Sequence, residues 1–130
     1  MNTFAVGLLT LLFASVSLAA PQSISPFQIE GDYKGSGLSV RTIVLDLESK
    51  HIAISSGVAS GACSGSISGV GTLVGNVLRF KPYKPFEGSD NCTMTITFGS
   101  KGKTATVEEN ECSAYPVSYT HLTLPTILRV

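Results

Sequence analysis

The chain has 130 residues, a formal net charge of zero and 14% charged residues, with 13 glycines and no tryptophan. This length leaves room for one domain, and the balanced charge gives no support to recognition of nucleic acid through a basic surface. We therefore expect no nucleic-acid partner. The abundance of Gly, Ser and Thr favours strands and tight turns over helices.

Residues 1–19 have the pattern of a secretory signal peptide. An uncharged apolar run extends from Phe4 to Leu18, and the small residues Ser17 and Ala19 fit the cleavage rule. The run is shorter than the roughly 20 residues that span a membrane, although no Lys or Arg precedes it, and a membrane anchor is the alternative. We expect cleavage after Ala19, no stable membrane insertion afterwards, and a secreted or periplasmic location where cysteines form disulfides.

Residues 20–37 are predicted to be a linker or edge segment. They contain two prolines and the run Gly35-Ser36-Gly37, which are turn and loop signals. Residues 38–116 are predicted to form a β domain that is truncated at its C-terminal end, for the reason given below.

The first predicted hairpin extends from Val40 to Ser55 and turns at Ser49-Lys50. Side chains alternate between the two faces of a strand, so this turn places one set of aliphatic residues on one face. That set is expected to face the core, and it consists of Ile43, Leu45, Leu47, Ile52 and Ile54.

A second hairpin is predicted at Gly75-Asn76, because both residues tolerate the positive φ of a tight turn. This turn pairs Leu73 with Leu78 and Gly71 with Phe80. A bulky aromatic side chain over a bare glycine is a common way to fill such a face.

A third hairpin is predicted with a turn at Lys101-Gly102, which pairs Phe98 with Ala105 and Ile96 with Val107. Threonines alternate with the inward residues of its first strand, as on a solvated antiparallel face. Those inward residues are Cys92, Met94, Ile96 and Phe98. We therefore expect an all-β fold, a small antiparallel meander, barrel or sandwich of about six strands.

Three cysteines allow one disulfide and leave one thiol over. Cys63 and Cys92 both point inward in the predicted register, which favours a bridge between them, worth about 3–4 kcal/mol in the chain-entropy model. Cys112 would then be the orphan cysteine, with its natural partner lost from the C-terminal end. The alternative is a Cys92–Cys112 bridge that leaves Cys63 unpaired.

Residues 117–126 resemble a translated transposon-derived sequencing adaptor over the whole stretch Val-Ser-Tyr-Thr-His-Leu-Thr-Leu-Pro-Thr. The resemblance implies that residues 117–130 are an artefact rather than native protein, with 127–130 read from an index sequence. A genuine terminal strand is the alternative.

Four stretches together resemble small exported bacterial β-sheet domains of unassigned function. They are Cys63-Ser-Gly-Ser-Ile-Ser-Gly-Val-Gly, Val-Gly-Asn-Val-Leu, Cys92-Thr-Met-Thr-Ile-Thr-Phe and Glu-Cys112-Ser. The resemblance implies a secreted β fold with two disulfides, and it implies no activity and no catalytic residue.

Candidate chemistry is sparse. His51 lies near Glu48 and Asp46 at a predicted turn, which is too few ligands for a metal site, and the serines have no base and orienting group beside them. We expect no enzymatic activity, no metal and no cofactor. The best binding candidates are basic and aromatic residues in and before a proline-stiffened connection, and they are Arg79, Lys81, Tyr83, Lys84 and Phe86.

These features predict a binding or inhibitor-type module whose partner is a protein or a small ligand. The alternative is a small-ligand carrier, in which inward glycines at 65, 69 and 71 leave space inside a barrel. A hydrolase is the least supported class.

Overall fold

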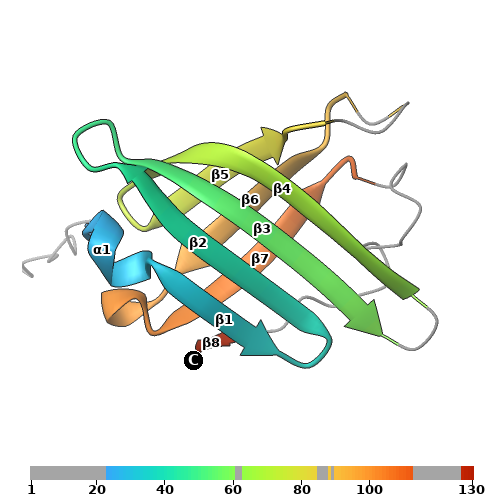
Figure 1. The fold of residues 1–130 in the computed structure, drawn as a ribbon, viewed down its shortest axis with the longest axis horizontal. Helices are drawn as coiled ribbons and strands as arrows, with labels where there is room; N and C mark the ends of the chain where they lie inside the picture. The colour runs from blue at the N-terminus through green and yellow to red at the C-terminus, as the bar shows by residue number, and fades with distance from the viewer. Residues whose placement is uncertain (1–22, 61–62, 85–87, 89, 113–126) are drawn as a thin grey trace, which may run out of the picture.

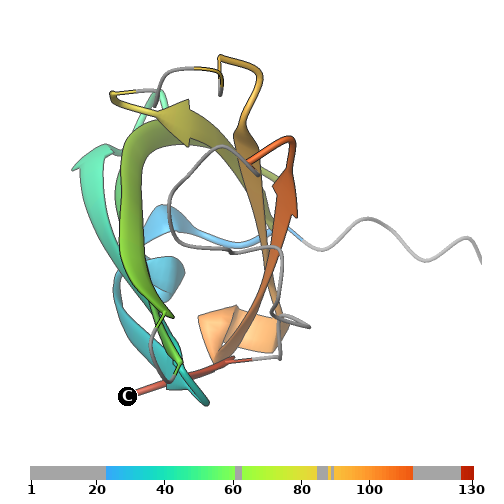
Figure 2. The same cartoon turned by 90° about the vertical axis from the view of Figure 1, so that its right-hand side faces the viewer.

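The computed structural model describes residues 23–60, 63–84, 88, 90–112 and 127–130. Within these residues, eight antiparallel strands form a closed barrel in which each strand pairs with the next along the chain (Figure 1). The last strand pairs with both the seventh and the first, which closes the barrel (Figure 2). The all-β prediction is confirmed, and the barrel is the form it takes, with eight strands rather than about six.

The strands are long on one wall of the barrel and short at its closure. They are β1 Gly31–Gly35, β2 Leu38–Asp46, β3 His51–Ser60, β4 Cys63–Val74, β5 Val77–Pro82, β6 Thr93–Phe98, β7 Thr104–Asn110 and β8 Ile127–Arg129. The short helix α1, Pro26–Ile29, and the 3₁₀ turn η1, Ser100–Gly102, contact each other at one end of the barrel.

That end is sealed by local and long-range contacts. Ser25 caps α1 in a capping box with Gln28, and Pro26 occupies the first helical turn. The hydroxyl of the buried Tyr33 donates to the carbonyls of Ile29, at 3.1 Å, and Gly102, at 2.8 Å. Gly102 has φ +66°, and a Cβ there would collide with the backbone of Gln28, so this closure requires glycine.

The core consists of the inward faces of the strands. Its fully buried large side chains include Tyr33, Ile52, Ile67, Leu73, Leu78, Met94, Ile96, Phe98 and Ile127. The rings of Tyr33 and Phe98 lie 5.6 Å apart between centroids. Thr42 is a polar exception, and its hydroxyl donates to the carbonyl of Ile29, which removes the cost of burying it.

The second and third hairpins have the predicted register. Leu73 pairs with Leu78 and Gly71 with Phe80, and Ile96 pairs with Val107 and Phe98 with Ala105. Lys101 and Gly102 both have positive φ in the η1 turn, so the turn chemistry was also identified correctly.

The prediction for the first hairpin is wrong in register and in face. Thr42 pairs with Ile54 and Val44 with Ile52, and the pairing shifts between Val44 and Asp46. The side chains facing the core from β2 are Leu38, Val40 and Thr42, with Val44 partly buried against it. Ile43, Leu45 and Leu47 are instead exposed, by 51%, 57% and 46%.

A polar cap and a register shift together explain this difference. The Asp46 carboxylate accepts hydrogen bonds from the backbone amides of Glu48, at 2.8 Å, and Ser49, at 3.0 Å, which builds a longer turn than Ser49-Lys50 alone. An aspartate that captures the amides two and three residues ahead is a typical turn device. The longer turn places Asp46 rather than Glu48 opposite His51, a move of two residues that keeps the parity. The register shift between Val44 and Asp46 then changes the parity, which moves the β2 side chains before it to the other face.

The predicted Cys63–Cys92 disulfide is wrong. Cys92 bonds to Cys112 with an S–S distance of 2.07 Å and a Cα–Cα distance of 4.5 Å. The bridge joins the residue before β6 to the second residue after β7, and both cysteines are buried. Since β6 and β7 pair up to Thr93 and Asn110, the bridge extends an existing ladder. Cys112 is therefore bonded, and Cys63 is the cysteine outside this bridge.

Two strands lie in segments that the sequence analysis placed outside the β domain. Gly31–Gly35, within the segment expected to be a linker or edge, forms β1 with partners in β2 and β8. Ile127–Arg129 forms β8, with Ile127 fully buried. Residues 113–126 lie outside the described residues, and the adaptor origin of 117–130 stays a prediction about the coding sequence.

Candidate functional site

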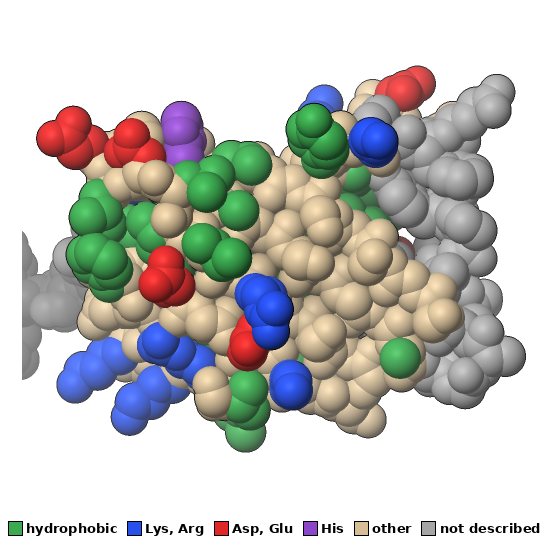
Figure 3. Space-filling view, in the orientation of Figure 1, with side chains coloured by type: hydrophobic (Ala, Val, Ile, Leu, Met, Phe, Trp, Pro, Cys, Tyr) green, Lys and Arg blue, Asp and Glu red, His purple; other side chains and the backbone are tan. Residues whose placement is uncertain are grey.

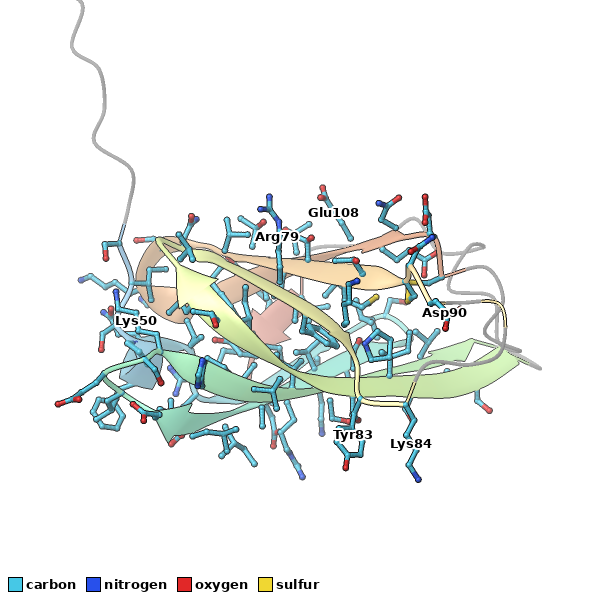
Figure 4. All side chains as sticks on the ribbon, turned by 90° about the horizontal axis from the view of Figure 1, so that it is seen from above. Lys50, Arg79, Tyr83, Lys84, Asp90 and Glu108 are labelled. Carbon is cyan, nitrogen blue, oxygen red and sulfur yellow. A yellow bond between two sulfur atoms is a disulfide. The ribbon has the colours of Figure 1, made fainter. Side chains whose placement is uncertain are left out.

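The predicted binding residues do not form one cluster. Arg79 and Lys81 are exposed on the outer side of β5, and Tyr83 and Lys84 follow its end. Figure 4 shows Arg79 pointing outward on the opposite side of the barrel from Tyr83 and Lys84. Phe86 lies outside the described residues. The predicted set therefore divides, and Tyr83 with its surroundings is the part that adjoins a groove.

Tyr83 extends the sheet without entering it. Its backbone amide donates to the carbonyl of Ser68 at 2.7 Å, which continues the β4–β5 ladder by one residue. Its ring is 81% exposed. An aromatic side chain fixed at its backbone and uncovered at its ring is a typical contact residue for a partner.

The groove beside Tyr83 follows from cross-strand pairing on the outer face. Across β2, β3 and β4, Ile43 pairs with Ala53 and Ala53 with Val70. In the neighbouring row, Arg41 pairs with Ser55 and Ser55 with Ser68. Small residues of β3 and β4 thus form the floor, and larger residues form the walls.

This groove has a volume of ≈ 400 Å³ and a largely apolar lining. Ile43 and Arg41 stand on one side, with Val70 and Tyr83 on the other. The two serine hydroxyls of the floor are hydrogen-bonded to each other, because Ser68 Oγ donates to Ser55 Oγ at 3.2 Å.

The groove belongs to a wider surface that we call the apolar outer face. Its members are Ile43, Leu45, Leu47, Val70, Val74 and Tyr83, all exposed between 46% and 81%. Figure 3 shows hydrophobic side chains gathered on the face formed by β2, β3 and β4. Large contiguous apolar patches are rare on monomeric proteins and mark interaction surfaces.

Charged residues adjoin this face at the β2–β3 turn and near Tyr83. Asp46, Glu48 and Lys50 belong to the β2–β3 turn, and Lys81 and Lys84 lie beside Tyr83. Figure 4 shows Lys50 near one end of the barrel and Tyr83 and Lys84 farther along its length. The hydrogen bonds from Ser49 hold the pKa of the Asp46 carboxyl below its ordinary value.

Along the side of the face, Arg41 is bound to Asp32. The Nε–Oδ1 distance is 2.5 Å and the second contact, from the other guanidinium nitrogen to Oδ2, is 3.1 Å. The hydrogen bond from Arg41 lowers the pKa of Asp32, and the bond to Asp32 raises the pKa of Arg41. This bidentate pair leaves the groove wall close to neutral.

The barrel interior lacks the space that two of its glycines suggested. A Cβ at Gly69 would collide with the backbone of Lys81 and approach Phe80 Cδ2 to 2.7 Å, and one at Gly71 would collide with the backbone of Arg79. These glycines allow close strand approach and make room for Phe80 itself. Gly65 is half-buried.

Among the described residues, the carboxyl group of Glu109 faces inward. Glu109 continues the inward series of Ala105 and Val107 and pairs with the buried Met94. Its Oε2 is buried and has no hydrogen-bond partner among the described residues. Desolvation raises the pKa of this carboxyl above its ordinary value.

The β2–β3 turn also holds a serine–histidine contact. Ser49 Oγ lies 3.1 Å from His51 Nδ1, but the Asp46 carboxylate is bound to backbone amides of the turn, and both Ser49 and His51 are exposed. A nucleophile needs an oriented base in a shielded site. Among the described residues, no three His, Cys, Asp or Glu side chains gather as metal ligands.

The described part of the chain contains no helix with the length and apolar character to cross a membrane. Comparison with protein-family models, characterised proteins and solved structures finds no match.

The sequence interpretation missed Ile43, Leu45 and Leu47 as surface residues. The signal was present, because the run Val40 to Leu47 carries apolar residues on both faces. A strand of that kind is typically covered on both sides.

Proposed function

We propose that this protein is an exported binding module, of the inhibitor type, that docks a protein partner through the apolar outer face. The observation that carries the proposal is the exposure of Ile43, Val70 and Tyr83 around one groove. Covering apolar surface is favourable by roughly 25 cal/mol per Å², so this face gains most from a partner. The disulfide between Cys92 and Cys112 is compatible with export.

A side-chain surface suits this barrel better than a strand-addition site. Closure of β1 onto β8 pairs both terminal strands, whereas partners that add a strand need an open edge. The groove also offers an aromatic ring beside aliphatic walls, the composition found at the centre of protein interfaces.

The carrier alternative has less support. Eight-stranded barrels are either filled by side chains or hold one small ligand. Phe80 and neighbouring backbone occupy the positions at Gly69 and Gly71, and the large inward side chains pack together as one core.

Site-specific photo-crosslinking tests the proposal. A photoreactive residue at Val70 should give covalent adducts when the purified protein is mixed with the exported fraction of its source. The matched control is Thr95, which is partly exposed on the outer side of β6 and lies away from the apolar outer face. Adducts from position 70 alone support the proposal. No adducts from position 70, or equal adducts from both positions, would overturn it.

A further inference from the structure

We propose that the slot between β1 and β7, which β8 fills (Figure 2), is a second binding site of this protein. It takes an extended segment of a partner protein in which an aliphatic residue is followed, two positions later, by a basic residue. With β8 in place the slot is closed. The site is therefore separate from the apolar outer face, and it opens only when β8 leaves it.

β8 is held in the slot by few ladder pairs. It pairs with β1 at two positions and with β7 at two positions, whereas β6 pairs with β7 at six. Among the described strands, β8 is therefore the one whose departure breaks the fewest pairs. Its release leaves the other seven strands paired in their chain order.

Main-chain hydrogen bonds fix a segment in the slot without regard to its sequence. The amide of Arg129 donates to the carbonyl of Lys103 at 2.9 Å, beside β7, and the amide of Val130 donates to the carbonyl of Asp32 in β1 at 2.9 Å. Partners that add a strand to a sheet use such bonds for affinity and side-chain pockets for specificity. If residues 117–130 are adaptor-derived, as the sequence indicates, β8 is itself a foreign segment that these bonds accept.

Two side-chain positions select the segment. Ile127 is fully buried and packs against Gly35, where a Cβ would lie 2.5 Å from Ile127 Cγ2, so this position takes an aliphatic residue opposite a glycine. Arg129 donates to the carbonyls of Gln28, at 2.8 Å, and Glu30. These carbonyls lie at the end of α1, where a helix leaves acceptors that a basic side chain can satisfy.

A partner segment has to bind more tightly than β8, because a strand on the same chain competes at an effective concentration on the order of millimolar. The edge of β7 offers additional pairs for this. From Val107 to Asn110, β7 pairs with β6 and, within the described part of the chain, with no other strand. Since Ile127 faces Ala105 in an antiparallel ladder, a segment that is longer on its N-terminal side would continue along this edge.

Fluorescence anisotropy with a labelled synthetic peptide of residues 126–130 tests the proposal on the full chain. In the chain, Ile127→Asp should remove β8 from the slot, because an unpaired charge is costly at a buried position. The Ile127→Asp chain should therefore bind the peptide about tenfold more tightly than the wild-type chain, in which β8 competes.

Substitutions in the peptide give the matched controls. Leu128 is 61% exposed, so a peptide with Leu128→Asp should bind as the unmodified peptide does. A peptide with Ile127→Asp should not bind. A peptide with Arg129→Ala should bind about fivefold more weakly, because it lacks the hydrogen bonds to the α1 carbonyls.

A folding measurement covers the case in which the Ile127→Asp chain is unfolded on its own. Added peptide should then restore its β-sheet circular dichroism, because a ligand that binds only the folded state stabilises it. The proposal is overturned by equal or absent binding to the two chains, by equal binding of the Ile127→Asp peptide, or by an unfolded variant that the peptide does not refold. None of these results bears on crosslinking from Val70, which tests the apolar outer face.

Discussion

The β6–β7 and β2–β3 hairpins lie on opposite walls of the barrel (Figure 1) and expose different kinds of side chain. Both bury aliphatic residues inward, such as Ile96 and Ile54. The outer side of β6 carries partly exposed threonines, whereas the outer side of β2 carries Ile43 and Leu45. The β6–β7 wall has its apolar residues on the inner face, and its outer face is polar and solvated. The β2–β3 wall has apolar residues on both faces, so its outer face is suited to contact with a partner.

Two isoleucines make the comparison quantitative. Ile96 is fully buried and Ile43 is 51% exposed. Ile96→Ala removes packed methyl groups and leaves a cavity, so it should lower the free energy of unfolding by about 3–4 kcal/mol. Ile43→Ala should lower it by less than about 1 kcal/mol. Urea unfolding of both variants measures this. Equal losses would mean that Ile43 belongs to the core.

The next largest expected loss of stability comes from removing the disulfide. It distinguishes the observed Cys92–Cys112 pairing from the predicted Cys63–Cys92 pairing. Cys92 and Cys112 are 20 residues apart in sequence, and closing a loop of this length stabilises by about 3 kcal/mol in the chain-entropy model. Cys92→Ala/Cys112→Ala should lose about that amount in urea unfolding, and Cys63→Ala should lose much less. Peptide mapping under non-reducing conditions should recover Cys92 linked to Cys112. A linked Cys63 would contradict the structure.

The contrast between the hairpins explains which parts of the fold could be predicted from the sequence. Gly75-Asn76 and Lys101-Gly102 are local turn signals, and the strands that flank them bury one face, so period-two alternation led to the correct register. In β2 both faces are apolar, and the decisive feature is the register shift between Val44 and Asp46, next to the turn that Asp46 caps. Alternation alone carries no information about which of two apolar faces is inside.

Closure of the barrel and the disulfide depend on contacts distant in sequence. The hydroxyl of Tyr33 donates to the carbonyl of Gly102, which is 69 residues away in sequence. No local pattern around residues 31–35 indicates that partner. Three cysteines permit three pairings, and inward parity did not exclude Cys92–Cys112. For the candidate site, composition predicts Tyr83 as a contact residue, and this stays a prediction; its neighbours Ile43 and Val70 come from strands whose packing had to be known first.

Adjacent glutamates on β7 give the smallest expected effect and separate the inner face from the outer one. Glu109 faces inward and its pKa is raised by desolvation, whereas Glu108 is exposed. A carboxyl whose pKa is higher in the folded state holds its proton longer than in the unfolded chain. Its contribution to stability is therefore present at low pH and declines as pH rises from about 4.5, the ordinary glutamate value, to the raised folded value.

Glu109→Gln removes this titration, so the variant should gain stability relative to wild type as pH rises through that window. Glu108→Gln, at the exposed neighbouring position, is the matched control. Asp32 and Asp46 act in the opposite direction, since their lowered pKa values make stability fall at acidic pH, but they are common to all three proteins and cancel in the difference. Urea midpoints measured from pH 4 to 8 give the comparison. A Glu109→Gln curve parallel to wild type would place that carboxyl in water and remove the distinction between the two faces of β7.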